Sequence, residues 1–169
     1  MFKILTICTG GLARSRAAEH LLNYHAGKWG MNVEATARGT SDVWQGEPLM
    51  ESLKTALTMR GLRHFSDRLS RQVTRADVQR ANLIVCMARD HLDEMQKRYP
   101  EAARRMILFN VLAHGTYSDV IDPLPSRKPG DTLPTVGELE QMVKDIETGI
   151  VTALPNLYLI TLGVQVARL

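Results

Sequence analysis

The sequence ILTICTGGLARSRAAEHLL, residues 4–22, decides the fold class of this chain. An apolar run ends at Cys8, a loop that contains two glycines follows, and apolar side chains then recur at helical spacing. This pattern predicts a buried strand over residues 2–7, a tight loop, and a helix that begins at Ser15. Such a loop points backbone N–H groups inward beside the positive end of the helix dipole, so we predict that it binds an anion.

The side chains of this loop suit chemistry on a phosphate group. Gly10 and Gly11 allow backbone conformations that a Cβ would obstruct, and Arg14 offers a planar, two-pronged donor that matches phosphate geometry. The same positive field favours the thiolate form of Cys8, which is a strong nucleophile. Ser15 has two alternative roles, as the N-cap of the helix or as a hydrogen-bond donor to the Cys8 sulfur. A cysteine near a strand end is by itself more often a small buried hydrophobic residue, but the strand–loop–helix context favours the nucleophile.

The composition is typical of a soluble globular protein. The 169 residues are 44% hydrophobic and 23% charged, and the net charge of +3 is too small to indicate nucleic-acid binding. Cys8 and Cys86 lie far apart in sequence, so we predict neither a disulfide framework nor a zinc site, and a reducing, cytoplasmic location. We also expect no signal peptide and no membrane span.

Strand and helix patterns alternate along the rest of the chain. This alternation predicts a parallel sheet covered by helices on both faces, with ligands bound at the carboxyl ends of the strands. The predicted strands are residues 33–37, 83–87 and 106–111, and the predicted helices are residues 49–59, a short helix capped by Thr74, residues 89–99, and a helix from residue 136 that Pro155 ends. The apolar tail, residues 157–169, is compatible with an added edge strand or with a surface that a partner covers.

Six arginines form a loose basic series in the middle of the chain. We interpret the series as a solvated face, with a substrate or partner patch as the alternative. Its members are Arg60, Arg63, Arg68, Arg71, Arg75 and Arg80.

The loop Cys8-Thr9-Gly10-Gly11-Leu12-Ala13-Arg14-Ser15 resembles the signature loop of the low-molecular-weight protein tyrosine phosphatases, which carry Cys-x5-Arg-Ser after their first strand. The resemblance continues in family order through Arg38-Gly39-Thr40 to Asp122-Pro123 and covers roughly residues 2–152. It implies an α/β fold of the phosphotyrosine protein phosphatase I type, a three-layer α/β/α sandwich with a four-stranded parallel sheet. Residues 1–169 then form a single domain, with residues 155–169 as a C-terminal extension.

The resemblance also implies a reaction and the residues that perform it. The reaction is hydrolysis of phosphate monoesters through a cysteinyl-phosphate intermediate, with phosphotyrosine in proteins as the favoured substrate, and with no metal or other cofactor. Cys8 is the implied nucleophile, Arg14 binds the phosphoryl oxygens, and Asp122 is the general acid, with Asp119 as the nearby competitor. The implied substrate-binding residues are Thr9, Gly10, Gly11, Leu12, Ala13, Ser15 and Trp44, and for Trp44 a packing role is an equal alternative.

Several positions depart from the family pattern. The family usually has asparagine at the position of Gly11 and histidine at that of Arg68, and these two residues support the shape of the loop. We therefore predict a looser loop and lower activity. An aromatic pair of the family is replaced by Leu124 and Pro125, so one wall of the phenyl cleft is expected to change.

Two other functions compete with the phosphatase. A phosphate- or phosphoprotein-binding module would explain the altered loop, but it has little need for both a thiol and an acid. Arsenate reduction on the same scaffold needs further redox cysteines, and Cys86, inside a predicted strand, is a poor candidate. The predicted partners are therefore a phosphotyrosine protein and an oxyanion in the loop, with no nucleic acid and no membrane, and the unusual tail is compatible with a homodimer.

Overall fold

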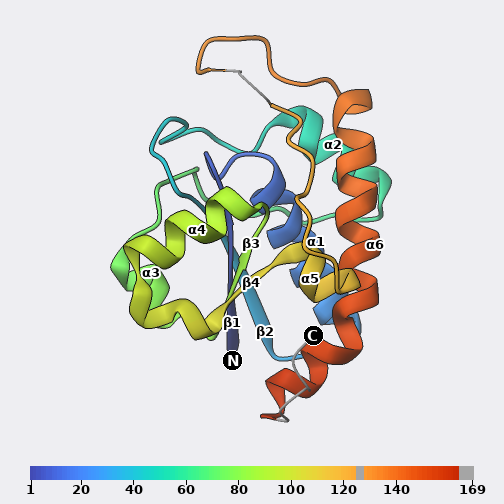
Figure 1. Cartoon of the computed structure of the whole chain (residues 1–169). Coiled ribbons are helices and arrows are strands. Elements are labelled where there is room, and N and C mark those ends of the chain that lie inside the picture. The colour runs from blue at the N-terminus through green and yellow to red at the C-terminus, as the bar shows by residue number, and fades with distance from the viewer. Residues whose placement is uncertain (125–127, 164–169) are drawn as a thin grey trace.

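The computed structural model of the chain describes residues 1–124 and 128–163. Four strands form one sheet in the order β2-β1-β3-β4 (Figure 1), and every neighbouring pair is parallel. The strands are β1 (Phe2–Cys8), β2 (Val33–Gly39), β3 (Leu83–Cys86) and β4 (Met106–Leu108). The predicted four-stranded parallel sheet is therefore confirmed.

Helices cover both faces of this sheet, which confirms the predicted three-layer arrangement (Figure 1). One face carries α1 (Arg14–Lys28), α2 (Glu51–Met59), α5 (Phe109–His114) and α6 (Val136–Thr161). The other face carries α3 (Arg75–Arg80), α4 (Arg89–Arg98) and the 3-10 helix η1 (Pro100–Arg105). No helix within the described part of the chain is long and apolar enough to cross a membrane.

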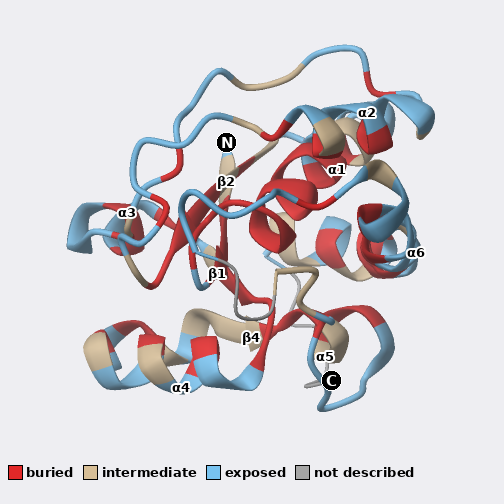
Figure 2. Ribbon diagram, turned by 90° about the horizontal axis from the view of Figure 1, so that it is seen from above, coloured by how far each residue is buried: buried red, intermediate tan, exposed pale blue. Residues whose placement is uncertain are grey.

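The central strand β1 is buried on both faces, as Figure 2 shows by colour. Ile4 packs in the core beneath α1 and α6, whereas Ile7 packs in the core beneath α3 and α4. The hydroxyl of Thr6, also fully buried, donates to the Ser15 carbonyl at 2.9 Å, so its burial leaves no unsatisfied donor. Two-sided burial explains why the sequence of β1 is almost continuously apolar.

The strand order places a binding crevice beside the carboxyl end of β1. The chain leaves β1 through α1 toward β2 on one side and later returns to pair β3 on the other side of β1. The loops that follow β1 and β3 therefore diverge, and the gap between them is where open α/β sheets bind ligands.

Side chains and a neighbouring segment cover the outer edge of β2. The Asn23 amide, from α1, donates to the Ala35 carbonyl at 3.1 Å and accepts from the Ala35 N–H at 2.8 Å. At the end of the strand, Gly39 donates to the carbonyl of Arg71 and accepts from the N–H of Val73. These contacts occupy backbone groups that an exposed edge would offer to another chain.

The predicted strand over residues 106–111 is only half right. β4 ends at Leu108, and residues from Phe109 onward form α5. Phe109, Leu112 and Ala113 recur at helical spacing and pack in the core that includes α6, so burial outweighs the strand propensity of the run. Gly115, in the left-handed conformation, ends the helix.

The prediction that Pro155 ends the last helix is wrong, because α6 continues to Thr161. Leu154 and Leu157 extend the buried stripe of α6 past the proline, and this packing offsets the ~3 kcal/mol that an interior proline costs a helix. The carbonyl deprived of its partner belongs to Val151, which is exposed and so can reach water. Of the two alternatives for the tail, the edge strand does not apply to residues 157–161, which are helical, and residues 164–169 lie outside the described part.

We expect the fold to lose stability in mild acid through His20. His20 is 5% exposed and packs edge-on against Phe65, and its burial, followed by the charges of Arg16 and Arg68, lowers its pKa to about 4. Between about pH 6.5 and pH 4 the unfolded chain binds a proton at His20 that the folded chain does not, so the free energy of unfolding falls with pH, by about 2 kcal/mol between pH 7.5 and pH 5. Urea unfolding at pH 7.5 and pH 5 measures this loss. It should shrink in His20→Leu, and an identical loss in wild type and variant would contradict the assignment.

Candidate active site

The loop between β1 and α1 is tied to the segment that follows β2. The N–H of Thr40 donates to the Cys8 carbonyl at 2.9 Å, and that of Ser41 donates to the Thr9 carbonyl at 3.0 Å. The loop is thus held at the carboxyl edge of the sheet, where the strand order predicts a ligand site.

Gly11 is required by the geometry of this loop. Its φ is +64°, and a Cβ at this position would lie 2.7 Å from the Gly39 nitrogen and 2.9 Å from the Arg38 carbonyl carbon. Both neighbours are backbone atoms that cannot move aside independently, so the loop and the end of β2 fit together only without a side chain at Gly11.

We expect Gly11→Ala to destabilise the protein by about 2 kcal/mol and to lower kcat/KM for an aryl phosphate, because the loop must shift to accommodate the new Cβ. The matched control is Gly30→Ala: Gly30 has the same φ of +64°, but a Cβ there meets no atom within 4 Å. Urea unfolding and steady-state kinetics on both variants separate the clash from the cost of the backbone conformation. Equal effects on kcat/KM would refute the argument.

The sulfur of Cys8 lies at the floor of the loop. It is 3.0 Å from the hydroxyl oxygen of Ser15, which is fully buried. The N-cap position of α1 is Ala13, and no side chain makes a capping hydrogen bond there. Of the two roles predicted for Ser15, the contact with sulfur is therefore the one present. A hydroxyl donor at this distance stabilises a thiolate.

Arg14 and Asp122 meet directly beside this thiol. Nη2 of Arg14 lies 2.8 Å from Oδ2 of Asp122, and Nη1 donates to the Val120 carbonyl at 3.3 Å. The competing acid Asp119 points elsewhere, since it accepts from the side chain of Arg89 at 3.1 Å and from the Arg89 N–H at 2.8 Å. The structure thus brings Asp122, rather than Asp119, to Arg14.

A cavity of about 360 Å³ opens over Cys8 and gathers most of the predicted site residues. Gly11 and Ser15 are the two predicted residues that do not line it; they support the loop from behind. The lining combines apolar side chains with the guanidinium of Arg14 and the carboxylate of Asp122. The lining residues are Cys8, Thr9, Gly10, Leu12, Ala13, Arg14, Ser41, Val43, Trp44, Asp122 and Leu124.

Trp44 packs on the loop and also lines the cavity, and its role in binding substrate stays a prediction. The ring packs on the loop so closely that a Cβ on Gly10 would lie 2.0 Å from its Cδ1 atom, and it also lines the cavity. Val43, at the position where the family usually has its aromatic residue, is 41% exposed and lines the same wall. Leu124 contributes to the wall as well, whereas Pro125 lies outside the described residues.

Gly11 and Arg68, which depart from the family pattern, make polar contacts of their own. The guanidinium of Arg68 pairs with Glu19 at 3.3 Å and with Glu34 at 3.0 Å. The hydroxyl of Ser70 donates to the Gly11 carbonyl at 2.9 Å in a buried position. The looser loop and lower activity stay a prediction, and the Ser70 hydrogen bond works against them.

His91, which the sequence analysis missed, contacts the loop from α4. Its Nε2 lies 2.9 Å from the Thr9 hydroxyl, and its burial, followed by the positive charge of Arg14, lowers its pKa to about 4. A neutral imidazole thus contacts Thr9, the residue that follows Cys8. Because β3 neighbours β1, a polar residue shortly after β3 is positioned to reach this crevice, which is the signal that was available in the sequence.

Cys86, the second cysteine, does not line the cavity over Cys8. It is fully buried in β3, and burial raises the pKa of its thiol to about 12. Within residues 1–124 and 128–163, no group of three or more histidine, cysteine, aspartate or glutamate residues is placed to hold a metal ion.

A thiol held with an arginine in an anion-binding loop, on this sheet, defines the class of cysteine-dependent phosphatases. Residues 3–157 match the family model described as low molecular weight phosphotyrosine protein phosphatase. The chain belongs to this family, and the predicted resemblance is confirmed. A comparison with curated protein sequences gives no match.

Solved structures with the same fold carry two different substrate names. A low molecular weight phosphotyrosine phosphatase from Vibrio cholerae O395 is 24% identical with a TM-score of 0.78, covering 93% of this chain and 97% of that one. The YwlE arginine phosphatase from Geobacillus stearothermophilus is 23% identical with a TM-score of 0.78, covering 99% of both chains. A mutant YwlE arginine phosphatase with a phosphorylated active-site serine is 19% identical with a TM-score of 0.76, covering 92% and 95%. Since these identities are low, the likeness establishes the fold alone.

Proposed function

We propose that this protein hydrolyses phosphotyrosine in proteins through a covalent phosphocysteine. One observation carries the proposal: Cys8, with the Ser15 hydroxyl 3.0 Å from its sulfur, shares one cavity with the Arg14–Asp122 pair. A nucleophile, an oxyanion binder and a proton donor are the three groups that phosphoryl transfer from an ester requires.

In the first step the Cys8 thiolate attacks phosphorus. The S–P bond forms as the P–O bond to the phenol breaks, and charge on the equatorial oxygens is met by Arg14 and the loop N–H groups. Asp122 transfers its proton to the departing phenolate oxygen, so tyrosine leaves as a neutral phenol.

In the second step water attacks the phosphocysteine. Asp122, now a carboxylate, accepts a proton from the water as the O–P bond forms and the S–P bond breaks. The Ser15 hydroxyl stabilises the returning thiolate. The related YwlE mutant with a phosphorylated active-site serine supports an enzyme-bound phosphoryl group in this fold.

The walls of the cavity favour an aryl ring over a guanidinium group. Leu12, Trp44 and Leu124 offer apolar surface, which suits the ring of phosphotyrosine. Among the described lining residues Asp122 is the one carboxylate, and it already pairs with Arg14. A phosphoarginine side chain would therefore find no second carboxylate for its guanidinium.

Phosphate release from three peptides, identical except for phosphotyrosine, phosphoserine or phosphoarginine, tests the substrate class. We expect kcat/KM to be about tenfold or more higher for phosphotyrosine, because only its ring fills the apolar wall. Faster release from phosphoarginine would overturn the substrate and leave the phosphatase reaction intact. No release from any peptide, with phosphate still bound by the loop, would favour the phosphate-binding module.

The burial of Cys86 argues against arsenate reduction, because a thiol with a raised pKa cannot relay a disulfide readily. The two free cysteines support the predicted cytoplasmic location, and the exposed Tyr158 and Leu159 on α6 are compatible with the predicted homodimer. We keep residues 1–169 as one domain in this proposal.

A further inference from the structure

A second cavity, of about 290 Å³, lies on the sheet face opposite to the one that carries α1. Lys3 and Leu5 of β1 and Thr36 and Arg38 of β2 line its floor, and they point to the side on which α3 packs. Because β2 is at the end of the sheet, this helix layer leaves part of the strand's face uncovered. The described residues that line the cavity include five cationic side chains, those of Lys3, Arg38, Arg68, Arg71 and Arg80, but only two carboxylates, those of Glu34 and Asp77.

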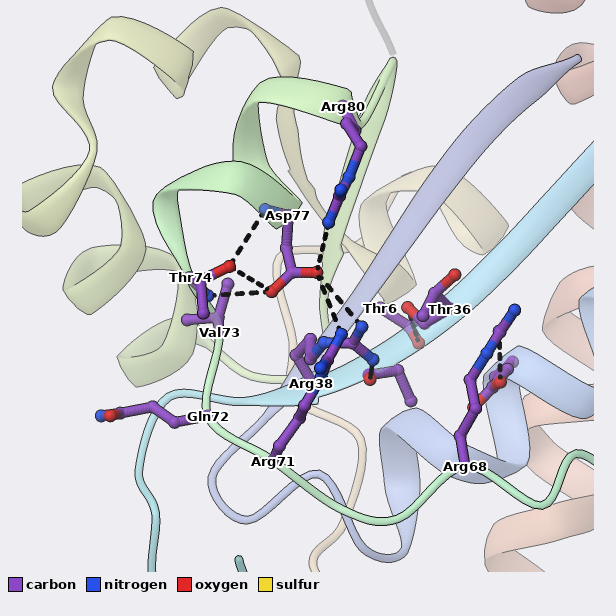
Figure 3. A network of polar contacts seen from close by, with 12 residues as sticks. Thr6, Thr36, Arg38, Arg68, Arg71, Gln72, Val73, Thr74, Asp77 and Arg80 are labelled. Carbon is purple, nitrogen blue, oxygen red and sulfur yellow. Dashed lines mark hydrogen bonds and ion pairs between the residues drawn. The ribbon is translucent and has the colours of Figure 1, made fainter.

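One carboxylate, Asp77, serves three of these arginines, as Figure 3 shows. Its Oδ1 lies 3.1 Å from Arg38, 3.4 Å from Arg80 and 3.9 Å from Arg71. Its Oδ2 is occupied by Thr74, which donates from both its N–H and its hydroxyl. A single carboxylate neutralises one guanidinium, so an excess of positive charge remains at the mouth of the cavity.

Arg38 is the buried member of this group of positive side chains. Its side chain is only 5% exposed, and in the described part of the chain its Nε has no hydrogen-bond partner. Burial lowers the pKa of Arg38; the hydrogen bond and the charge of Asp77 oppose this shift, and the charge of Arg71 adds to it. Because Arg38 shares its one carboxylate partner, Asp77, with Arg71 and Arg80, a further anion at this cavity would be favourable.

We propose that this cavity binds a compact phosphate-bearing polyanion at a site separate from the catalytic loop. Arg71 and Arg80 approach Asp77 from opposite sides with their side chains 52% and 61% exposed, so both are free to turn toward a ligand (Figure 3). Arg68 lies beyond Thr36 on the other side of the cavity. Arginines arranged around a hollow match the geometry of phosphate groups, which accept paired N–H donors.

The cavity is large enough only for a small ligand. Its volume is at the lower end of the range for small-molecule sites, so a small phosphorylated molecule fits better than a folded partner. Three members of the basic series, Arg68, Arg71 and Arg80, thus converge on one hollow. For these three residues the proposal favours the patch, which the sequence analysis kept as the alternative to a solvated face.

Titration of ¹⁵N-labelled protein with inorganic pyrophosphate tests the proposal, because amide shifts report each site separately. We expect shifts at Thr36, Arg38 and Ala81 that saturate, with a dissociation constant distinct from that of any shifts at residues 9–13. In the double variant Arg71→Gln, Arg80→Gln the dissociation constant at the cavity should rise roughly tenfold or more, since two charged donors are lost. Hydrolysis of p-nitrophenyl phosphate should be unchanged in this variant.

Two further variants test whether the affinity for pyrophosphate depends on the charge at the cavity or on the overall charge of the protein. Glu34→Gln removes one of the two carboxylates, so the cavity should bind pyrophosphate more tightly than in wild type. Arg104→Gln removes one positive charge outside the cavity, at an exposed position on η1, and should leave the affinity unchanged. Absence of saturable shifts at the cavity, or an equal loss of affinity in Arg104→Gln, would overturn the proposal, because binding would then reflect only the overall charge.

Discussion

Cys8→Ser is expected to reduce hydrolysis of p-nitrophenyl phosphate by roughly 10⁴-fold or more. The oxygen of serine stays protonated at neutral pH, whereas the thiol is placed beside the Ser15 hydroxyl, which stabilises its anion. The loop itself should remain intact, since its backbone contacts to Thr40 and Ser41 do not involve the sulfur. Steady-state kinetics measure the loss, and vanadate binding by calorimetry measures the retained anion site.

Cys86→Ala is the matched control for the nucleophile. Cys86 is the other cysteine of the chain, and it is buried in β3 with a pKa raised to about 12. Its removal should cost some stability and leave kcat nearly unchanged. If Cys86→Ala were inactive while folded, or if Cys8→Ser kept its activity, phosphocysteine chemistry at Cys8 would be refuted.

Asp122→Asn should lower kcat for phenyl phosphate by about 10²- to 10⁴-fold, the usual contribution of a general acid. The amide keeps the shape of the side chain beside Arg14 but cannot deliver a proton to the leaving oxygen. The loss should be smaller for p-nitrophenyl phosphate, because a good leaving group departs without protonation. A comparison of kcat for the two esters in wild type and variant measures this dependence.

Asp119→Asn separates the two neighbouring acids. Asp119 holds Arg89 through its side chain and backbone, and its pKa is lowered chiefly by that hydrogen bond. Its loss should loosen the start of α4 and leave the dependence on the leaving group as in wild type. A leaving-group effect that follows Asp119 instead of Asp122 would move the acid role to Asp119.

Much of the site could be predicted because its members are close together in sequence. Cys8, Arg14 and Ser15 lie within one strand–loop–helix unit, and the period of the apolar residues around them predicts that unit directly. The same holds for Thr74, where the predicted N-cap appears as a full capping box with Asp77.

The partners that come from distant segments were harder to predict. Ser70 lies 59 positions from its contact Gly11, and His91 lies 82 positions from its contact Thr9. Nothing in the local sequence distinguishes Ser70 from an ordinary polar residue, and the one signal for His91 is its place shortly after β3. At Pro155 the local sequence gave a wrong prediction, the end of the helix. The cost of a proline inside a helix is outweighed there by the burial of Leu154 and Leu157.

The sequence by itself predicted four strands, although β4 ends at Leu108, and the loop that carries the thiol, since hydrophobic period and glycine placement are local properties. The alternation of strand and helix patterns predicted that the sheet is parallel. Only the tertiary structure decided that Asp122 rather than Asp119 meets Arg14, and that Arg38, Arg71 and Arg80 share a single carboxylate. Distances between side chains depend on how layers pack, and packing sums many weak contacts that no single stretch of sequence contains.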